Sequence, residues 1–550
     1  MSARAQQRFD EALALHRQGQ LPLAEILYRD VLRLAPTHAQ TLFHLGILQQ
    51  QSGRLDEALA SFDQALAQVA DNPQLHLRRG VALHQLGRFE DALAAYGRAL
   101  ALRPEAADVL NNAGMALHKL GRHDEAIAHY ERSLALEANA AETEMNLGVA
   151  LYELNRFEEA RARHERALAL RPGSPDVQAN LANALLELGL HQEALELYRK
   201  VAQARPRDAD LQMNLGNVLR DMHCQEEALA SYARALALDP QNADVHWNQA
   251  IALLTMGDLA RGWREYEWRL RMPAMADVQR TFAAPPWRGE VPLSGRTILL
   301  HAEQGLGDTL QFCRYAAVLQ AQGANVKLEV QRPLVALLRG QPGLGDVIAK
   351  GTDPGACDFH CPLMSLPFAC GTTLDNVPAP VPYVRPDPAL AQRWSQELGP
   401  ARRPRIGLAW SGNAANPNDH RRSIPLANLL AGLPRDASYW SLQKEVAPED
   451  LRLIEADRRI QRFSENTFEH TAAQIASLDA VVCVDTSIGH LAGALGARTF
   501  VLLAHSADWR WLSGRTDTPW YPRHTLLRQP APSDWASALG RLAGELATVG

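Results

Sequence analysis

Along the first half of the chain, small, bulky and helix-breaking positions recur with a period of 34 residues. A small residue fills one column, from Ala24 to Gly262, and a bulky ring fills another, from Tyr28 to Tyr266. Proline follows the second segment of several units, where it cannot continue a helix. A further column consists of Gly19, Gly53, Gly87, Gly121, Asn155, Gly189, His223 and Gly257. The pattern predicts eight helix pairs over residues 5–276, each burying its apolar face against its neighbours.

This period is typical of the tetratricopeptide repeat (TPR). We therefore assign residues 1–276 to a TPR α-solenoid, whose inner surface is lined by the first helix of each pair. On that helix, two residues before the small close-packing position, one column consists of Asn112, Asn146, Asn180, Asn214 and Asn248. Asparagine is a poor helix former, so five copies at one exposed helical position need a reason.

The asparagine column has two interpretations. An amide both donates and accepts, so these side chains can bind the backbone of an extended peptide without reading its sequence. Alternatively, they only bond across the repeat junction. The array resembles the TPR superhelix of protein O-GlcNAc transferases, in which an asparagine ladder grips the acceptor polypeptide. The resemblance implies that these five residues bind an acceptor peptide.

Residues 277–296 break the period, and we interpret them as an irregular linker. The surrounding segment is rich in proline, with Pro273, Pro285, Pro286 and Pro292. Four tryptophans lie near it in the sequence: Trp247, Trp263, Trp268 and Trp287. They indicate either an apolar seam between the two parts of the chain or aromatic residues scattered through separate cores.

Beyond the linker, short apolar runs alternate with helical segments. One series has runs at 297–303 and 326–330, and a second has runs at 405–413, 438–443, 479–487 and 499–504. Runs that are apolar throughout belong to parallel strands covered on both faces. We therefore predict two Rossmann-like α/β halves, residues 297–395 and 396–550, facing a cleft. Ligands of such sheets bind beyond the carboxyl ends of the strands.

The first loop at such a strand end, residues 304–312, places two glycines before Asp308. No Lys-Ser/Thr pair follows, which excludes a phosphate-cradling P-loop. An aspartate that opens a helix is frequently an N-cap, which is the structural interpretation of Asp308. A helix start also stabilises a carboxylate and weakens it as a base, so Asp308 could instead orient an acceptor.

Two further loops offer ligands for an anion. In residues 410–426, Arg421 and Arg422 could neutralise a diphosphate, and Ser411 and Asn413 offer contacts beside them, although a polar loop can also be merely solvated. In residues 483–496 a buried strand ends and a helix rich in small residues begins, so its first amides make an anion site. The polar residues there are Asp485, Thr486, Ser487 and His490.

These loops and the two-half layout resemble glycosyltransferase family 9, the heptosyltransferase group with the GT-B fold, over about residues 297–530. The resemblance implies that Asp308 is the catalytic base. It also implies that the donor diphosphate is bound by Asp485, Thr486, Ser487 and His490, where Ser487 departs from the glycine of the family. A GT-B enzyme uses a nucleotide sugar as substrate and needs no metal or further cofactor.

Composition argues against some classes of partner and favours one cellular location. The 56 basic and 62 acidic residues give a net charge of −6, which offers no global reason to bind nucleic acid. Six irregularly spaced cysteines favour a reducing cytoplasm over a disulfide framework. We expect neither a secretory signal nor a membrane span. A competing zinc site made of Cys357, His360, Cys361 and Cys370 has poorly fitting spacing.

We therefore expect a cytoplasmic glycosyltransferase whose TPR array presents a polypeptide for transfer to Ser or Thr. Such a reaction needs a base for the acceptor hydroxyl and fixed positive charge for the departing nucleotide. Resemblance to TPR-bearing flagellin glycosyltransferases makes flagellin a plausible acceptor. The alternatives are a transferase acting on a glycan or lipopolysaccharide, with repeats used for assembly, and a non-catalytic TPR scaffold. The sequence leaves oligomerisation open.

Overall fold

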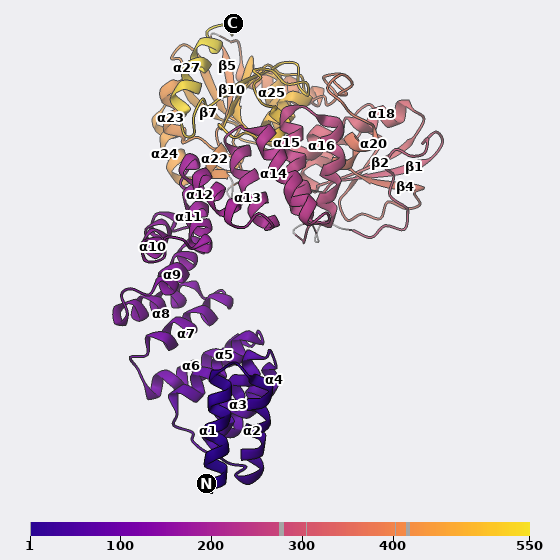
Figure 1. Cartoon of the computed structure of the whole chain (residues 1–550). Coiled ribbons are helices and arrows are strands. Elements are labelled where there is room, and N and C mark those ends of the chain that lie inside the picture. Colours follow the sequence, from indigo (N-terminus) through magenta and orange to yellow (C-terminus); the bar gives the residue numbers. More distant parts are fainter. Residues whose placement is uncertain are drawn as a thin grey trace. The chain divides into compact units, whose positions relative to one another are not determined.

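The computed structural model describes residues 2–273, 275, 280–303, 305–401, 403–413 and 419–549. The chain divides into two compact units, Met1–Pro206 and Arg207–Gly550. Sixteen helices lie within the first 266 residues of the described chain, and a region of parallel strands follows them (Figure 1). No helix in the described ranges has the length and apolar character that crossing a bilayer requires.

The first unit consists of six helix pairs. Their bounds are α1 Ala3–Arg17, α2 Leu21–Leu34, α3 Ala39–Gln51, α4 Leu55–Leu66, α5 Pro73–Gln85, α6 Phe89–Leu102, α7 Ala107–Lys119, α8 His123–Leu136, α9 Ala141–Glu153, α10 Phe157–Leu170, α11 Pro175–Glu187 and α12 His191–Ala204. The second unit begins with two more pairs, α13 Ala209–Asp221 with α14 Gln225–Leu238 and α15 Ala243–Met256 with α16 Leu259–Tyr266. The predicted eight pairs are confirmed.

Two columns of the repeat have a direct physical cause. The column from Gly19 to Gly257 forms the turn inside each helix pair and has a left-handed backbone, with φ of 75° at Gly19. Asn155 and His223 adopt the same conformation, with φ of 58° and 60°. In five of the eight pairs the bulky column packs against glycine in the first helix, namely Gly46, Gly80, Gly114, Gly148 and Gly216. A Cβ added to Gly114 would lie 2.5 Å from the Tyr130 ring, so helix contact at this spacing requires glycine. The repeat therefore encodes both its turn and its closest helix contact.

The short 3₁₀ helix η1, Glu267–Arg271, ends the last repeat, and residues 277–279 of the predicted linker lie outside the described residues. The rest of the linker is less irregular than predicted. Pro286 forms a parallel bridge to His360, and the Trp287 amide donates to the His360 carbonyl at 2.8 Å. The linker is therefore attached to the edge of the first sheet, because the edge strand still has free backbone groups there.

The first sheet has four parallel strands in the order β3-β2-β1-β4. Its elements are β1 Thr297–His301, α17 Leu306–Phe312, α18 Tyr315–Ala321, β2 Asn325–Val330, α19 Arg332–Leu338, β3 Asp346–Ala349, β4 Phe359–Pro362, η3 Leu363–Ser365 and α20 Leu366–Ala369. β1 lies between β2 and β4, so the loop after it opens at the middle of the carboxyl edge.

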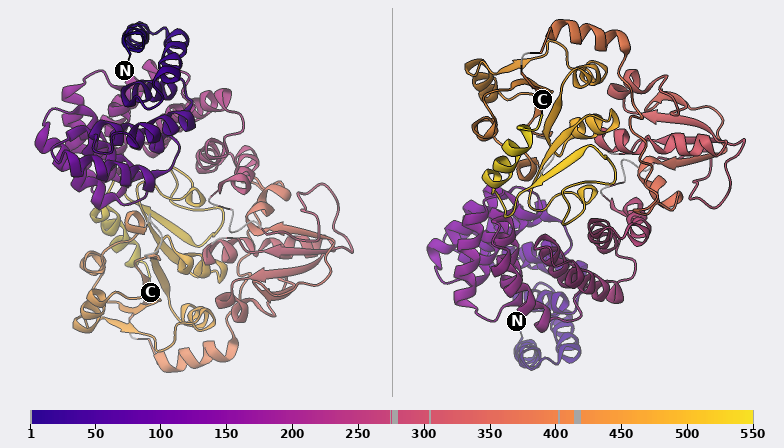
Figure 2. Two further views of the ribbon diagram at one scale, coloured as in Figure 1. Left: turned by 90° about the horizontal axis from the view of Figure 1, so that it is seen from below. Right: turned by 90° about the horizontal axis from the view of Figure 1, so that it is seen from above.

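The second sheet has six parallel strands in the order β10-β9-β8-β5-β6-β7. Its elements are α21 Pro388–Leu398, β5 Arg405–Ala409, α22 Asp419–Arg422, α23 Leu426–Gly432, β6 Ser438–Ser441, α24 Pro448–Ala456, β7 Ile460–Arg462, α25 Phe468–Ala476, β8 Ala480–Val484, α26 Ser487–Ala494, β9 Thr499–Leu503, η4 Trp509–Trp511, β10 His524–Arg528 and α27 Trp535–Leu546. The two sheets are separate layers within the second unit (Figure 2). The predicted pair of α/β halves is present, and their assignment to the GT-B fold stays a prediction.

An aromatic seam joins the last repeat to the α/β part of the second unit. Trp263 of α16 is buried and meets Trp509 of η4 edge-on, with ring centroids 5.1 Å apart. The same ring contacts Phe312 and Trp520. The predicted seam is thus confirmed for Trp263, whose partners come from α17, from η4 and from the segment before β10.

Candidate functional site

A pocket of about 450 Å³ lies within the second unit at the carboxyl end of the second sheet. The sheet contributes the loops after β8 and β9 and the end of α22, through Arg421, Arg422, Asp485, Leu503, Ala504, Ser506, Ala507 and Asp508. The last two repeats contribute the other wall, through Arg220, Asp221, His223, Gln225, Trp247, Asn248, Ile251 and Thr255. The pocket is therefore shared between the repeat and the sheet, at the edge where α/β proteins bind ligands.

Direct contacts hold the two walls together. The Ser506 hydroxyl donates to the Asp221 carbonyl at 3.2 Å, and the Ser513 amide donates to the Thr255 carbonyl at 2.8 Å. The rings of His223 and His505 meet edge-on with centroids 4.5 Å apart. His223 reaches this position because it takes the left-handed turn of its repeat. The last two repeats are thus part of the same compact unit as the sheet.

The pocket carries both signs of charge. Burial, followed by the nearby charge of Asp508, raises the pKa of Asp485 to about 6. Arg422 is paired with Asp419, its Nε lying 2.9 Å from Oδ1. Gly412 lies under this pair, since a Cβ there would be 2.4 Å from Arg422 Nη2. The glycine therefore lets the guanidinium approach the backbone, which is the arrangement expected of an anion-binding loop.

The other residues predicted to bind the donor phosphates lie nearby, but differ in availability. The Ser411 amide is occupied by the side chain of Gln443 at 3.2 Å, and residues 414–418 of the loop lie outside the described residues. Asn413 is exposed. Thr486 is the N-cap residue of α26, and Ser487 is its first residue. The Thr486 hydroxyl oxygen is buried without a hydrogen-bond partner among the described residues, so it can still bond a ligand.

His490 is placed for packing. Burial, followed by the charge of Arg510, holds its pKa well below the usual range, which keeps the ring neutral. Its Nδ1 lies 2.9 Å from the Tyr521 hydroxyl, and the ring stacks on Trp511 with centroids 5.6 Å apart. A neutral ring would contribute little attraction to a phosphate. Its position instead brings α26 against α17 of the other sheet.

The contact between α17 and α26 requires a glycine. A Cβ at Gly307 would lie 2.7 Å from His490 Cδ2. We therefore expect Gly307→Ala to destabilise the protein by about 1–3 kcal/mol, as other overpacking substitutions do. Gly305→Ala is the matched control, because Gly305 has φ of −71° and a Cβ there would have its closest contact at 3.4 Å. Thermal unfolding of both variants checks this, and equal loss in the two would contradict it.

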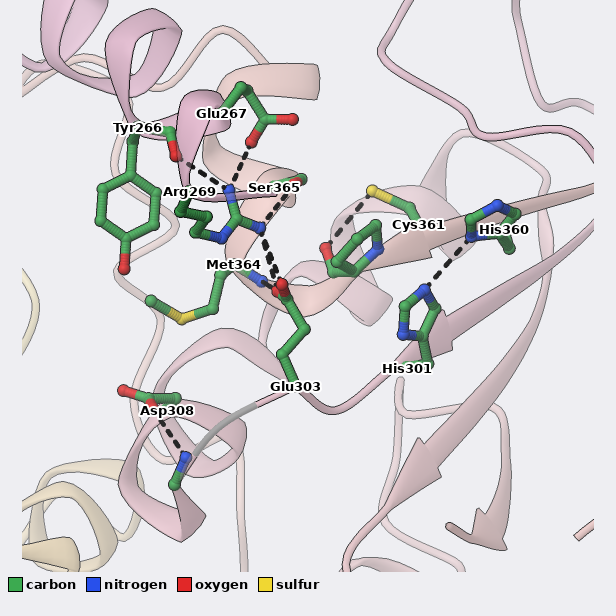
Figure 3. A network of polar contacts seen from close by, with 12 residues as sticks. Tyr266, Glu267, Arg269, His301, Glu303, Asp308, His360, Cys361, Met364 and Ser365 are labelled. Carbon is green, nitrogen blue, oxygen red and sulfur yellow. Dashed lines mark hydrogen bonds and ion pairs between the residues drawn. The ribbon is translucent and has the colours of Figure 1, made fainter. Parts of the chain in front are cut away.

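Asp308 lies in the first turn of α17, and its carboxylate accepts hydrogen bonds from two residues. Its Oδ2 accepts the Gly305 amide at 3.0 Å, which is the N-terminal capping contact considered from the sequence (Figure 3). Its Oδ1 accepts Arg510 Nη2 at 2.5 Å. The same guanidinium binds Asp508 at 2.8 Å and Gln311 at 3.0 Å. Arg510 thus links the residue predicted to be the base with an acidic residue of the pocket.

The charge state of Asp308 results from opposing influences. Burial is the largest and raises its pKa above the ordinary range, and the nearby carboxylate of Asp508 acts in the same direction. Arg510 and the Gly305 amide lower it without cancelling the effect of burial. A raised pKa strengthens a carboxylate as a base. Burial therefore opposes the helix start, which by itself would weaken Asp308 as a base.

The asparagine column has mixed surroundings, and its side chains are half-buried rather than exposed. Asn112 donates to the Asp108 carbonyl of its own helix, and Asn146 donates to Asn111 of the preceding repeat at 3.2 Å. Asn248 accepts Arg220 Nη1 at 3.0 Å and lines the pocket. The side chains of Asn180 and Asn214 form no hydrogen bond among the described residues. Cross-repeat bonding therefore accounts for Asn146, whereas Asn180 and Asn214 are available to a peptide.

The cysteines of the zinc alternative do not gather. Cys361 lies in β4 with its Sγ 3.4 Å from the Pro362 carbonyl, and His360 Nδ1 faces His301 Nε2 at 3.2 Å (Figure 3). Within the described ranges, no three His, Cys, Asp or Glu side chains are grouped as metal ligands.

Three arginines of this region carry interactions that sequence reasoning missed. They are Arg220 in the pocket, Arg510 beside Asp308, and Arg269, whose buried side chain binds Glu303 at the end of β1 (Figure 3). Arg510 lies between two tryptophans, Trp509 and Trp511. That juxtaposition of a charge with large apolar rings is the signal that could have identified it.

Comparison with known proteins supports the repeat. Tetratricopeptide repeat family models match residues 43–96, 105–173 and 151–218, and a TPR repeat model matches residues 80–121 and 225–257. Protein FlbA of Caulobacter vibrioides is 26% identical over 329 residues, which are 54% of this chain and 54% of FlbA. The chain therefore matches about half the length of that relative.

Two solved structures are similar to part of the chain. A tetratricopeptide repeat protein from Parabacteroides merdae is 18% identical over 46% of this chain and 100% of its own, with a TM-score of 0.39. PilF of Pseudomonas aeruginosa is 21% identical over 38% of this chain and 96% of its own, with a TM-score of 0.36. The family models by themselves show that the N-terminal part of the chain consists of tetratricopeptide repeats.

Proposed function

We propose that this protein transfers a sugar from a nucleotide-sugar donor to a Ser or Thr hydroxyl of a polypeptide that the TPR array binds. The observation that carries the proposal is the shared pocket, because one cavity is lined by the carboxyl-edge loops of a parallel sheet and by the last two peptide-binding-type repeats. A polypeptide on the repeats and a nucleotide on the sheet would meet in such a pocket.

The donor side would be formed by the loop that ends with Arg421 and Arg422 and by the start of α26. Fixed positive charge and helix-start amides stabilise a diphosphate, and more so as negative charge develops on the departing nucleotide. The unpaired Thr486 hydroxyl can donate one further hydrogen bond. In this proposal the halves are a GT-B pair, the donor is a substrate, and no metal takes part.

The acceptor side would use Asp308 as the base. Its carboxylate would take the proton of the acceptor hydroxyl as the hydroxyl oxygen attacks the anomeric carbon and the nucleotide diphosphate leaves. Arg510 would hold the carboxylate in place through the contact at 2.5 Å. Within the second unit, Asn214 would bond the backbone of the bound polypeptide.

The resemblance of the chain to TPR-bearing flagellin glycosyltransferases supports a flagellar acceptor. We therefore propose flagellin as the first acceptor to test. Incubation of the purified chain with flagellin and ADP-, UDP-, GDP-, CMP- or dTDP-linked sugars should give a mass increase of one sugar on Ser or Thr. Transfer to glycan but not to polypeptide would favour the glycan transferase, and no binding of any donor would favour the scaffold.

Donor binding gives a test that is independent of the acceptor. We expect Arg422→Met to weaken binding of the preferred nucleotide sugar about 10–100-fold, because a charge-assisted hydrogen bond contributes about 1.5–3 kcal/mol. Arg459→Met is the matched control: its side chain is 28% exposed against 27% for Arg422, and it also pairs with a nearby aspartate, but it does not line the pocket. Calorimetric titration would refute the donor assignment if both variants bound like the wild type.

A further inference from the structure

The end of the last repeat inserts a buried arginine beside the first sheet. Arg269 lies in η1, directly after α16, and its side chain is 0% exposed. Its Nη2 donates to the two carboxylate oxygens of Glu303 at 3.1 and 3.0 Å and to the Ser365 hydroxyl at 2.8 Å. Its Nη1 donates to Glu267 at 2.8 Å. A single guanidinium therefore joins the repeat to two segments of the α/β region (Figure 3).

Glu303 is the point at which this arginine reaches the glycine loop. It lies two residues after β1, and its side chain is 2% exposed. Besides Arg269, its carboxylate accepts the Met364 amide at 3.1 Å. A carboxylate that is buried and bonded on both oxygens has little freedom to move. The chain therefore enters the loop before Asp308 from a fixed point.

The far side of the same loop is fixed by a second arginine. Asp308 accepts the Gly305 amide and Arg510, and Arg510 comes from the second sheet. The loop is thus held between Arg269 of the last repeat and Arg510 of the second sheet, through one carboxylate at each end. Both arginines are buried, so neither contact is weakened by solvent as a surface ion pair would be.

We propose that Arg269 is a positioning residue, which acts through Glu303 to hold the glycine loop where Asp308 can serve as the base. The inference rests on the proposed transferase function. A general base must lie within hydrogen-bond reach of its proton, and misplacement by about 1 Å can cost about 10²-fold in rate. Arg269 thereby makes the geometry of the base depend on the end of the repeat array.

The test uses the full chain with both members of the ion pair replaced, Arg269→Met/Glu303→Leu. Removing both charges leaves only Glu267 without its partner, and its side chain is 19% exposed and so reaches solvent. Apolar replacements of buried ion pairs often preserve stability. We expect a thermal midpoint near that of the wild type, kcat at least about tenfold lower, and KM for the donor within about twofold. Arg271→Met is the matched control. Arg271 lies in the same short helix, but its guanidinium lies over the Trp268 ring and donates to Gln241 instead of reaching Glu303.

A pH profile distinguishes positioning from general damage. Burial is the main cause of the raised pKa of Asp308, while Arg510 and Asp508 are the charged groups facing it and the adjacent His490 is neutral. Loosening the loop would admit water and lower that pKa, so the acid limb of kcat should move to lower pH in the double variant. Arg271→Met should keep the wild-type limb.

Hydrogen exchange of residues 305–312 supplies a measurement that needs no activity. The amides there should exchange at least about tenfold faster in the double variant than in the wild type or in Arg271→Met. If the wild type transfers no sugar, the proposed function fails, whereas exchange still decides whether Arg269 holds the loop. Unchanged exchange would overturn the inference, as would a loss of kcat without a shift of the acid limb. Should the double variant not fold, Glu303→Gln, which keeps the side-chain shape, undergoes the same measurements with the same criteria.

Discussion

Asp308→Asn is expected to lower kcat for sugar transfer by about 10²–10⁴-fold, the usual contribution of a positioned general base. The amide cannot accept the proton of the acceptor hydroxyl, whereas donor binding should persist because Asp308 does not line the pocket with Arg421 and Arg422. The transfer assay identifies the donor and the acceptor. Steady-state kinetics with these substrates then measure kcat and the KM for the donor.

The pH dependence of the wild type checks the same assignment. Burial raises the pKa of Asp308, and only the deprotonated form is a base, so activity should fall as pH falls through that raised value. The limb should disappear in Asp308→Asn. Asp346→Asn serves as the control, because Asp346 is exposed and begins β3. It follows Gly-Leu-Gly in the sequence, as Asp308 does. Equal activity of Asp308→Asn and the wild type would exclude Asp308 as the base.

Arg510→Met is expected to destabilise the second unit by about 3–5 kcal/mol, because it leaves the carboxylates of Asp308 and Asp508 without their buried partner. The Arg510 side chain is only 10% exposed, so water cannot replace it fully. Urea unfolding followed by tryptophan fluorescence measures the loss, since Trp509 and Trp511 flank the substituted residue.

The sign of the pH effect follows from the pKa of Asp308. Arg510 lowers this pKa, so its removal raises it further above the value in the unfolded chain. The folded variant then binds more protons than the unfolded chain over that interval, and its stability decreases as pH rises through it. The loss in free energy of unfolding caused by Arg510→Met should therefore be larger at pH 8 than at pH 5.

A surface ion pair provides the control for this substitution. Arg515 binds Asp517 at 2.7 Å, but the two side chains are 38% and 66% exposed. Arg515→Met should therefore change the free energy of unfolding by only about 0–1 kcal/mol. A comparable loss in Arg510→Met would mean that the buried network contributes no more than a solvated pair.

The repeats could be predicted from the sequence because their contacts are local. Gly114 meets Tyr130 within one helix pair, and the turn glycines need no distant partner. Six apolar strands of the two sheets were equally evident: β1, β2, β5, β6, β8 and β9. The short β7, Ile460–Arg462, and β10, His524–Arg528, were missed because both contain charged or polar residues and lie at sheet edges, where one side is less covered.

The sequence likewise brought out the candidate site in part. Asp308, Arg422 and Asp485 follow strands at the carboxyl edges, and that placement depends only on the order of strand and loop. Whether a given side chain then faces a ligand is decided by packing. His490 illustrates this: the structure buries it as a neutral ring beside Trp511 and Tyr521, and its predicted contact with a phosphate stays a prediction.

By itself, the sequence determined the repeat, the α/β halves and the loops that end at their carboxyl edges, because periodicity and apolar runs are written in neighbouring residues. Only the tertiary structure decided that Arg510 reaches Asp308 across 202 positions, that Arg269 reaches Glu303 across 34, and that the last two repeats form a wall of the pocket. Such contacts depend on how separate elements pack, and no local pattern of residues records that packing.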